Sequence, residues 1–451
     1  MKLTFDAWKE GNVAPATSSV SVQPPPLNPD APKAEPVSEL FAGTLRHPVK
    51  TASLPVVRYS PDGTRLLAAG DMYSGVVQLW DVDARKEVLQ ITPARFERAK
   101  GQNQSFLAEG YALLSPDGQT LYVPTREAKT TRVERDGKKA DLFEFTGRVR
   151  RWDVASKKEL DPFTPPAGWG NFRADLSPDG KFLSSVEVKS RLRTDPPGEQ
   201  FVVWDTATGK RTVIDGTGGS PRFLPGGKGV VTATAGKEGT VTVAVHPLAD
   251  GKPAVSKPHA GGGGWATVAD VSADGKRIAV SLGGGTKGKP AAILLLDADT
   301  LEETARWTGP ANPFGFGHTA GVFTPDGKRF LVVDGDNALN VFDVAAKKVV
   351  RTVPLGGSSP RLVTSGDGRW FATAWTPDRD KLGNAPHTDP DLLPQPRVVL
   401  VDLKDPESKP ATLVAPRGIA WGLAFRPDGK QLALGGTGGV HLFDLTKLGG
   451  R

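Results

Sequence analysis

The stretch Ser60-Pro61-Asp62-Gly63 decides the fold, because near copies of it recur along the whole chain. The eight copies begin at Ser60, Ser115, Ser177, Leu224, Ser272, Thr324, Ser365 and Arg426. An apolar residue usually precedes each copy and an apolar run follows it. Proline fixes φ at one corner of a tight turn and glycine supplies the permissive φ at another, so each copy predicts a hairpin between two strands.

Each copy belongs to a unit with the same order of apolar runs. A third run ends in Asp, as in Leu79-Trp80-Asp81, and a fourth run follows a polar turn. Four antiparallel strands in a unit are typical of a propeller blade. The fourth unit is weaker because its turn is Pro225-Gly226-Gly227, but the distance from Asp179 to Asp274 leaves room for a blade between them. We therefore predict an all-β fold consisting of a single eight-bladed β-propeller, with seven blades as the alternative.

The two ends of the chain predict how the ring closes. Residues 445–451 are too few for an outer strand in the last blade, whereas residues 38–46 form a spare strand before the first unit. We expect this N-terminal strand to complete blade eight and leave no open edge. Residues 1–36 are rich in Pro and polar residues and cannot bury enough surface to order themselves. The expected organisation is a disordered tail or linker over 1–36 and the propeller over 37–451.

With these motifs the chain resembles the WD-repeat (WD40-like) β-propeller family, in which a turn like Ser-Pro-Asp-Gly separates the first two strands and Trp-Asp ends the third. The resemblance covers residues 38–448. The chain departs from the family because the Gly-His dipeptide before the first strand is nearly absent, with Gly317-His318 the clear candidate. A related bacterial propeller family is therefore an alternative. The resemblance implies a non-catalytic scaffold that mediates protein–protein interaction.

Composition narrows the classes of function. The 451 residues include no Cys, which excludes disulfide frameworks, thiolate zinc sites and Cys nucleophiles. The first residues lack the apolar core of a signal peptide, and no apolar run is long enough to span a bilayer. We expect a soluble, cytoplasmic monomer without membrane insertion. The net charge of +7 permits contact with nucleic acid, but Lys and Arg are spread along the chain, so the pattern does not favour a nucleic acid. A protein partner is what the resemblance to the WD-repeat family implies.

The long insertions predict which face of the propeller binds. They fall between second and third strands or between units, at 92–109, 125–142, 187–199, 311–319 and 376–395. Loops on a rigid scaffold commonly carry binding residues, and tolerated surface insertions are the alternative. The charges of 125–142 either pair with one another or attract an acidic protein. The candidate partner-binding residues are Arg126, Arg132, Arg135, Arg191, Arg193, His318, Asp378 and His387.

No catalytic or metal motif stands out. Residues 283–290 nearly match a phosphate-binding loop, but Pro290 replaces the required Ser or Thr. The acidic residues of 378–391 lack calcium-loop spacing, and no nucleophilic triad has a recognised spacing. We predict no enzyme activity, no cofactor and no metal. The alternative is a propeller enzyme or small-molecule-binding propeller, such as a quinoprotein-like dehydrogenase. The repeats of those quinoproteins are loosely similar to Asp297-Ala298-Asp299-Thr300-Leu301 and Trp307 of this chain.

Overall fold

The computed structural model describes most of the chain from residue 35 onward. The described ranges are 35–48, 54–70, 75–92, 112–135, 137–195, 198–214, 221–236, 239–248, 251–261, 266–283, 291–310, 321–357, 362–377 and 393–450. The chain divides into two units, Met1–Ala34 and Glu35–Arg451. All of the described residues belong to the second unit, so the predicted tail lies almost wholly outside them.

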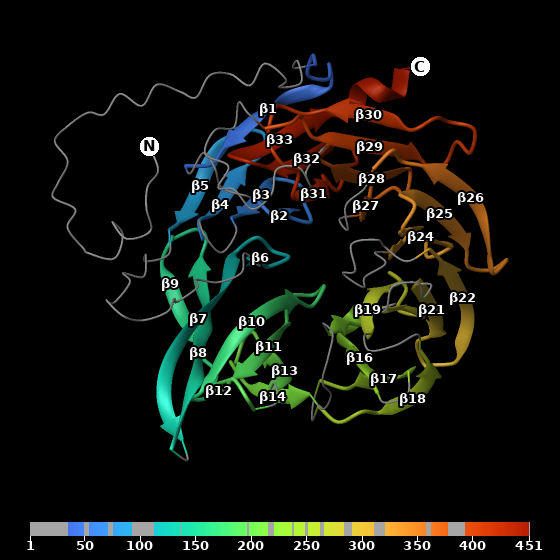
Figure 1. Cartoon of the computed structure of the whole chain (residues 1–451). Helices are drawn as coiled ribbons and strands as arrows, with labels where there is room; N and C mark the ends of the chain where they lie inside the picture. Colours follow the sequence, from blue (N-terminus) through green and yellow to red (C-terminus); the bar gives the residue numbers. More distant parts are fainter. Residues whose placement is uncertain are drawn as a thin grey trace, which may run out of the picture. The chain divides into compact units, whose positions relative to one another are not determined.

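Eight antiparallel sheets follow one another around a ring, and each is one blade (Figure 1). Blade 1 contains β2 (Val56–Tyr59), β3 (Arg65–Ala69), β4 (Val77–Asp81) and β5 (Lys86–Ile91). Blade 2 contains β6 (Leu113–Leu114), β7 (Thr120–Arg135), β8 (Lys138–Asp153) and β9 (Glu159–Phe163), with β12 (Arg191–Leu192) added to it. Blade 3 contains β10 (Trp169–Leu176), β11 (Phe182–Lys189), β13 (Glu199–Asp205) and β14 (Arg211–Ile214).

The other five blades repeat the same order. Blade 4 contains β15 (Arg222–Phe223), the 3-10 turn η1 (Pro225–Gly227), β16 (Val230–Ala235), β17 (Thr240–His246) and β18 (Val255–Ala260). Blade 5 contains β19 (Ala266–Val271), β20 (Arg277–Leu282), β21 (Ala291–Asp297) and β22 (Glu303–Gly309). Blade 6 contains β23 (Gly321–Phe323), β24 (Arg329–Val333), β25 (Ala338–Asp343) and β26 (Lys348–Pro354). Blade 7 contains β27 (Leu362–Thr364), β28 (Trp370–Trp375), β29 (Arg397–Asp402) and β30 (Ala411–Val414).

Blade 8 joins the two ends of the propeller. It contains β31 (Gly422–Phe425), β32 (Gln431–Gly436) and β33 (Gly439–Asp444), and η5 (Thr446–Gly450) follows. Its outer strand is β1 (Phe41–Arg46), which pairs antiparallel with β33 from Phe41↔Phe443 to Arg46↔Gly439. The predicted eight-bladed, all-β fold and its closure by the N-terminal strand are therefore confirmed.

The recurring turn is held by its own side chains. In blade 1, the Ser60 hydroxyl donates to Asp62 Oδ1 (2.5 Å), and the same oxygen accepts from the backbone N–H of Thr64 (3.0 Å). The hydrogen bond from Ser60 keeps the pKa of Asp62 below its usual range, so this carboxylate stays ionised. Gly63 takes the left-handed φ of 71°. These contacts explain why Ser, Asp and Gly recur together.

The middle strands of the blades form the core. Residues 66–69 of β3 are all buried, although they are consecutive. A blade has a neighbour on each side, so both faces of its middle strands are covered and the sequence shows an apolar run instead of alternation. One cluster packs Val243 of blade 4 with Ile278 of blade 5. The ring is thus held by apolar contacts between successive blades.

The structure corrects the prediction of a loop at 125–142. These residues continue β7 and β8 into a hairpin whose strands are 16 residues each. The middle strands of the other blades are five to eight residues long. Opposite charges face each other across the hairpin, at Lys129↔Glu144 and Glu134↔Lys139. Such cross-strand pairs stabilise a ribbon even where strand propensity is low.

Candidate functional sites

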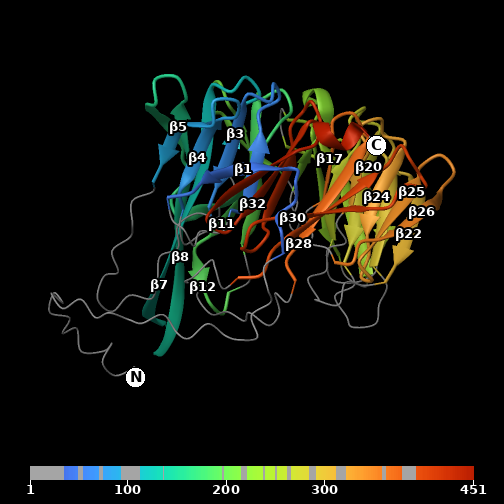
Figure 2. The same cartoon turned by 90° about the horizontal axis from the view of Figure 1, so that it is seen from above.

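The strand order gives the propeller two different faces. Turns between first and second strands and between third and fourth strands lie on one face, here called the turn face. Connections between second and third strands and between blades lie on the other, here called the loop face. The ends of β7 and β8 run past the other blades on the loop face (Figure 2).

On the turn face, neighbouring turns are packed against each other. A Cβ added to Gly180 of blade 3 would lie 2.7 Å from Cδ of Pro116 in blade 2, and one added to Gly63 of blade 1 would lie 3.4 Å from Cδ of Pro427 in blade 8. Turn glycines with a side chain of the preceding blade within 4 Å are Gly63, Gly180, Gly227, Gly275, Gly327, Gly368 and Gly429. Gly118 of blade 2 is different, because none of the described atoms would lie within 4 Å of its added Cβ.

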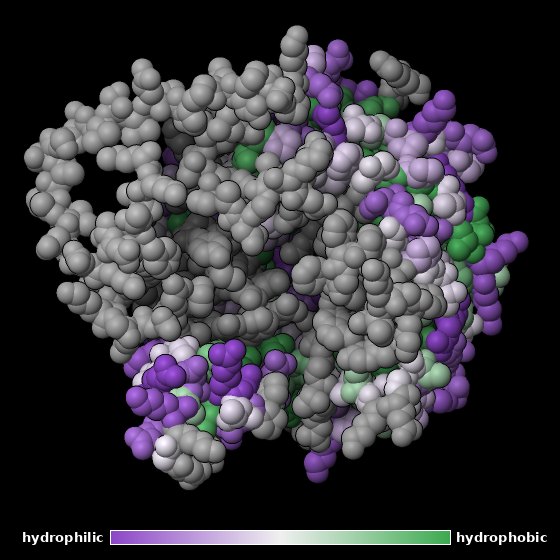
Figure 3. All heavy atoms as spheres, viewed as in Figure 1, coloured by the Kyte–Doolittle hydropathy of each residue, from purple (hydrophilic) through white to green (hydrophobic). Residues whose placement is uncertain are grey.

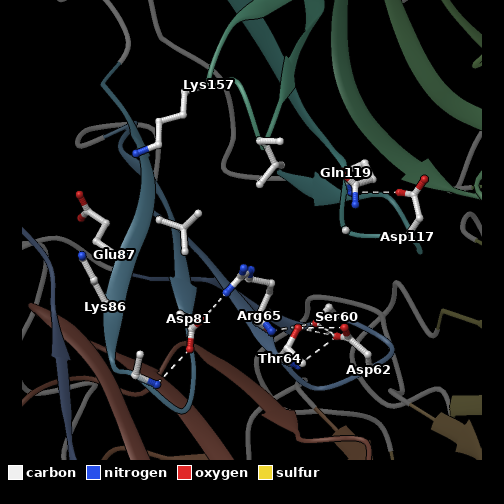
Figure 4. A pocket seen from close by; sticks show the side chains of 15 residues that line it. Ser60, Asp62, Thr64, Arg65, Asp81, Lys86, Glu87, Asp117, Gln119 and Lys157 are labelled. Atoms are coloured by element: carbon white, nitrogen blue, oxygen red, sulfur yellow. Dashed lines mark hydrogen bonds and ion pairs between the residues drawn. The ribbon is translucent and has the colours of Figure 1, made fainter.

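A polar pocket opens at this seam between blades 1 and 2 (Figure 4). It encloses about 500 Å³. Its wall comes from the turns of both blades and includes Ser60, Asp62, Thr64, Arg65, Asp81, Lys86, Glu87, Asp117, Gly118, Gln119 and Lys157. Turns that touch at the other seams are separated here, which accounts for the cavity.

The carboxylates of the pocket already have hydrogen-bond donors. Asp81 accepts from the backbone N–H of Ala84 (3.0 Å) and pairs with Arg65, and these contacts keep its pKa below the usual range. Asp117 accepts from the Ser115 hydroxyl (2.5 Å), which lowers its pKa in the same way. These acids therefore hold the turns. Within the described residues, no three His, Asp or Glu side chains come together as metal ligands.

The hairpin of β7 and β8 lies on the loop face, and contacts between its charged side chains stabilise it. Lys129 Nζ lies 3.7 Å from Glu144 Oε2, and the Thr131 hydroxyl donates to the same oxygen (2.7 Å). Arg132 faces Asp141 across the hairpin, and Asp141 Oδ2 lies 3.8 Å from an Arg193 nitrogen. Hydrophilic residues predominate over this part of the surface (Figure 3). Of the charges of 125–142, Asp141 thus pairs with Arg193 of the neighbouring insertion, and Lys129 pairs with Glu144 outside that range.

An insertion from blade 3 anchors the hairpin. β12 pairs with β8 at Arg191↔Phe143, and the Ser190 hydroxyl accepts from the backbone N–H of Phe145 (2.8 Å). The rings of Phe143 and Phe145 stack with centroids 6.4 Å apart, and the Arg191 guanidinium lies 5.9 Å from the Phe143 centroid. Arg191 also donates to the carbonyl of Asp195 (2.7 Å). The hairpin is therefore fixed to the propeller along part of β8.

The structure brings together three of the predicted partner-binding residues. Arg132 lies on the hairpin, and Arg191 and Arg193 lie beside it. Arg126 and Arg135 belong to β7, although only their backbone is described. The remaining candidates lie outside the described residues, namely His318, Asp378 and His387.

Sequence reasoning missed the pocket at the seam between blades 1 and 2. Its residues belong to ordinary copies of the repeated turn, and nothing in Gly118 distinguishes it from Gly180 in sequence. The missing contact depends on how two blades pack, which no local pattern encodes. It also missed β12, for which the apolar Leu192 among the charges of 187–199 was the available signal.

Fold and sites together define an eight-bladed β-propeller with one elaborated face. Its fold is similar to the C-terminal WD40 domain of Sif2, with a TM-score of 0.55 and 13% sequence identity over 88% of this chain and 99% of that chain. Neither a family model nor a curated protein matches the chain. Among the described residues, no helix is long and apolar enough to cross a membrane.

Proposed function

We propose that this propeller is a non-catalytic scaffold that mediates protein–protein interaction through its loop face. The hairpin of β7 and β8 is the observation that carries the proposal. Its strands are 16 residues each, and β12 and Ser190 anchor it. A long, anchored projection on a rigid ring is a surface that a partner protein can grip. The likeness to a WD40 domain supports an interaction role.

The partner expected at this site is an acidic protein. Arg132 is exposed and, within the described residues, forms no ion pair. Arg193 and Lys189 are exposed beside the hairpin. Exposed cations with few partners raise the rate at which an acidic surface associates and favour it over a basic one.

The alternative of a quinoprotein-like enzyme has no support from the residues that suggested it. Asp297 Oδ1 accepts from the backbone N–H groups of Asp299 (3.1 Å) and Thr300 (2.9 Å), so this motif is a turn between two strands. Trp307 is buried in the core cluster shared by blades 5 and 6. Both features have a structural use, and neither points to a ligand.

The test compares the intact protein with a variant in which residues 126–147 are replaced by Asp-Gly. The cut joins Thr125 to Arg148, which already face each other, so the blade can close. Native capture with cross-linking and mass spectrometry should lose specific partners from this variant. The matched control shortens residues 284–290, which follow β20 and precede β21 in sequence, and should retain them. An unchanged set of partners, or no specific partner beside a positive turnover assay, would contradict the proposal.

A further inference from the structure

Among the described strands, none pairs with one edge of β7 along most of its length, and this edge is here called the open edge. On that side β6 pairs only with Leu121 and Tyr122. From Val123 to Arg135, none of the described strands pairs with this edge, while β8 pairs with the other one throughout. The outer edge of β8 is partly occupied by β9 and β12. Of the two strands of the hairpin, β7 is therefore the one with the open edge.

The register shows which backbone groups of β7 point outward. Two residues separate β7 from β8, and in a hairpin of that spacing the flanking pair, here Arg135↔Lys138, exchanges both backbone hydrogen bonds. Alternate pairs do the same, which turns the N–H and C=O of Thr130, Arg132 and Glu134 away from β8. Pro124 falls in this outward set, where its missing N–H leaves the ladder with β8 intact. Outward groups thus alternate along an uninterrupted edge.

The edge is also regular. The pairing of β7 with β8 has no register shift over its whole length, whereas β10 with β11 and β19 with β20 each contain one. Bulges and short lengths are common means of protecting an edge from further pairing. β7 has neither, and Pro124 together with the charged side chains distinguishes it from a strand open to any partner.

The charged side chains near the open edge indicate which kind of added strand would bind there. On β7 itself, Lys129 is already paired with Glu144, whereas Arg132 is exposed and forms no ion pair within the described residues. Across the hairpin, Glu134 faces Lys139, and Asp141 contacts Arg193, which follows β12 on the far side of β8 from this edge. An acidic segment added to β7 therefore meets the unpaired charge of Arg132, whereas a basic segment meets like charge.

We propose that β7 receives an extended acidic segment of a partner protein as an added strand, paired along Lys129 to Glu134. This inference rests on the proposed scaffold function and specifies how the hairpin binds. Backbone hydrogen bonds to Thr130, Arg132 and Glu134 supply the affinity, and the Arg132 guanidinium selects the acidic sequence.

The probe for this site is a synthetic twelve-residue peptide of alternating Glu and Thr, tested on the full chain. Its binding should slow hydrogen exchange at the outward amides of Thr130, Arg132 and Glu134 by about tenfold or more. The amides of Lys129, Thr131 and Val133 already face β8 and should change little. No binding of this peptide at millimolar concentration, or equal binding of its Lys-for-Glu counterpart, would overturn the proposal. Binding of single-stranded RNA in its place would also overturn it.

Two variants separate strand addition from other contacts. Thr130→Pro removes one outward N–H and should weaken the peptide at least about tenfold, while Thr130→Val keeps the N–H and should bind as the native protein does. Unchanged exchange at Lys129 and Thr131 shows that the hairpin of the Pro variant is intact. Arg132→Glu leaves the backbone unaltered and should weaken the peptide about fivefold or more.

The outcomes also distinguish this inference from the scaffold function. If the shortened hairpin loses native partners but Thr130→Pro retains them, the scaffold stands and strand addition is wrong. If neither variant loses a partner, the proposed function itself is wrong. Equal peptide binding by Thr130→Pro and Thr130→Val would overturn strand addition by itself.

Discussion

At the scale of single residues, glycine has two separable uses in the repeated turn. Gly118 and Gly180 both have left-handed backbones, with φ of 70° and 73°. Both N–H groups donate to the first residue of the turn, Ser115 or Ser177, over 2.8 Å. They differ in surroundings, because Pro116 packs on Gly180 and nothing described packs on Gly118. The two positions form a natural pair for measuring strain and contact separately.

Substitution of this pair by Ala should give unequal losses of stability. Gly118→Ala incurs the left-handed backbone penalty alone, about 1 kcal/mol. Gly180→Ala adds an overlap with the Pro116 ring at 2.7 Å, which should cost about 1–3 kcal/mol more. Chemical unfolding of both variants measures the difference. Equal losses would mean that the turns do not press on each other.

His441 should make the propeller less stable in acid. Its Nδ1 lies 2.9 Å from the Thr44 hydroxyl of β1, and burial lowers its pKa from 6.5 to about 4. In the unfolded chain this histidine regains its usual pKa and binds a proton at a higher pH than in the folded chain. The free energy of unfolding is therefore undiminished above pH 6.5. It falls as pH drops from 6.5 to about 4, by up to about 3 kcal/mol. Between pH 6.5 and about 4, the melting temperature of the His441→Gln variant should fall less than that of the native protein. Parallel decreases of the two melting temperatures would exclude His441 as the cause.

At the scale of elements, the first strand is a latch on the last blade. Leu45 of β1 is buried with Val440 of blade 8, with Leu66 of blade 1 and with Leu54, which precedes blade 1. The Thr44 hydroxyl contacts His441 in the neighbouring strand. Without β1, both the edge of β33 and this cluster would face water.

Deletion of residues 1–46 should therefore lower the melting temperature by roughly 10 °C, since several buried side chains and a strand pairing are lost. The matched control deletes residues 1–34, leaves β1 in place and should melt close to the intact protein. Calorimetry on the three proteins tests the latch. A melt that is the same for both deletions would show that β33 needs no partner.

The elements also show which parts of the fold could be predicted from sequence. Each turn depends on four adjacent residues, such as Ser60 to Gly63, so its chemistry is visible locally and the blades could be counted. The outer part of β7 was predicted as a loop because its residues are mostly charged, and charged residues are poor strand formers alone. Its strand conformation depends on partners in β8, such as Glu144 for Lys129, and on anchoring by β12. That information lies between segments rather than within one.

At the scale of the whole molecule, two sets of contacts close the ring, namely apolar clusters between blades and packing between neighbouring turns. The two sets are distributed differently around the ring. Apolar clusters join successive blades, including Leu79 of blade 1 with Leu121 and Trp152 of blade 2. The packing of turns on the turn face is missing at that same seam, where the pocket lies (Figure 4). Blades 1 and 2 are therefore joined through their core, with less support at the turn face.

This asymmetry predicts where the ring opens first. Local opening frees a backbone amide from its hydrogen bond, and it needs less free energy where fewer neighbours hold the segment. The amide of Gly118 should therefore exchange hydrogen faster than that of Gly180, by about tenfold, although both donate over 2.8 Å within the same kind of turn. Native-state exchange measured by mass spectrometry on peptides covering the two turns makes the comparison. Equal rates would mean that the apolar cluster alone sets the stability of this seam and that packing between turns adds nothing to the closure of the ring.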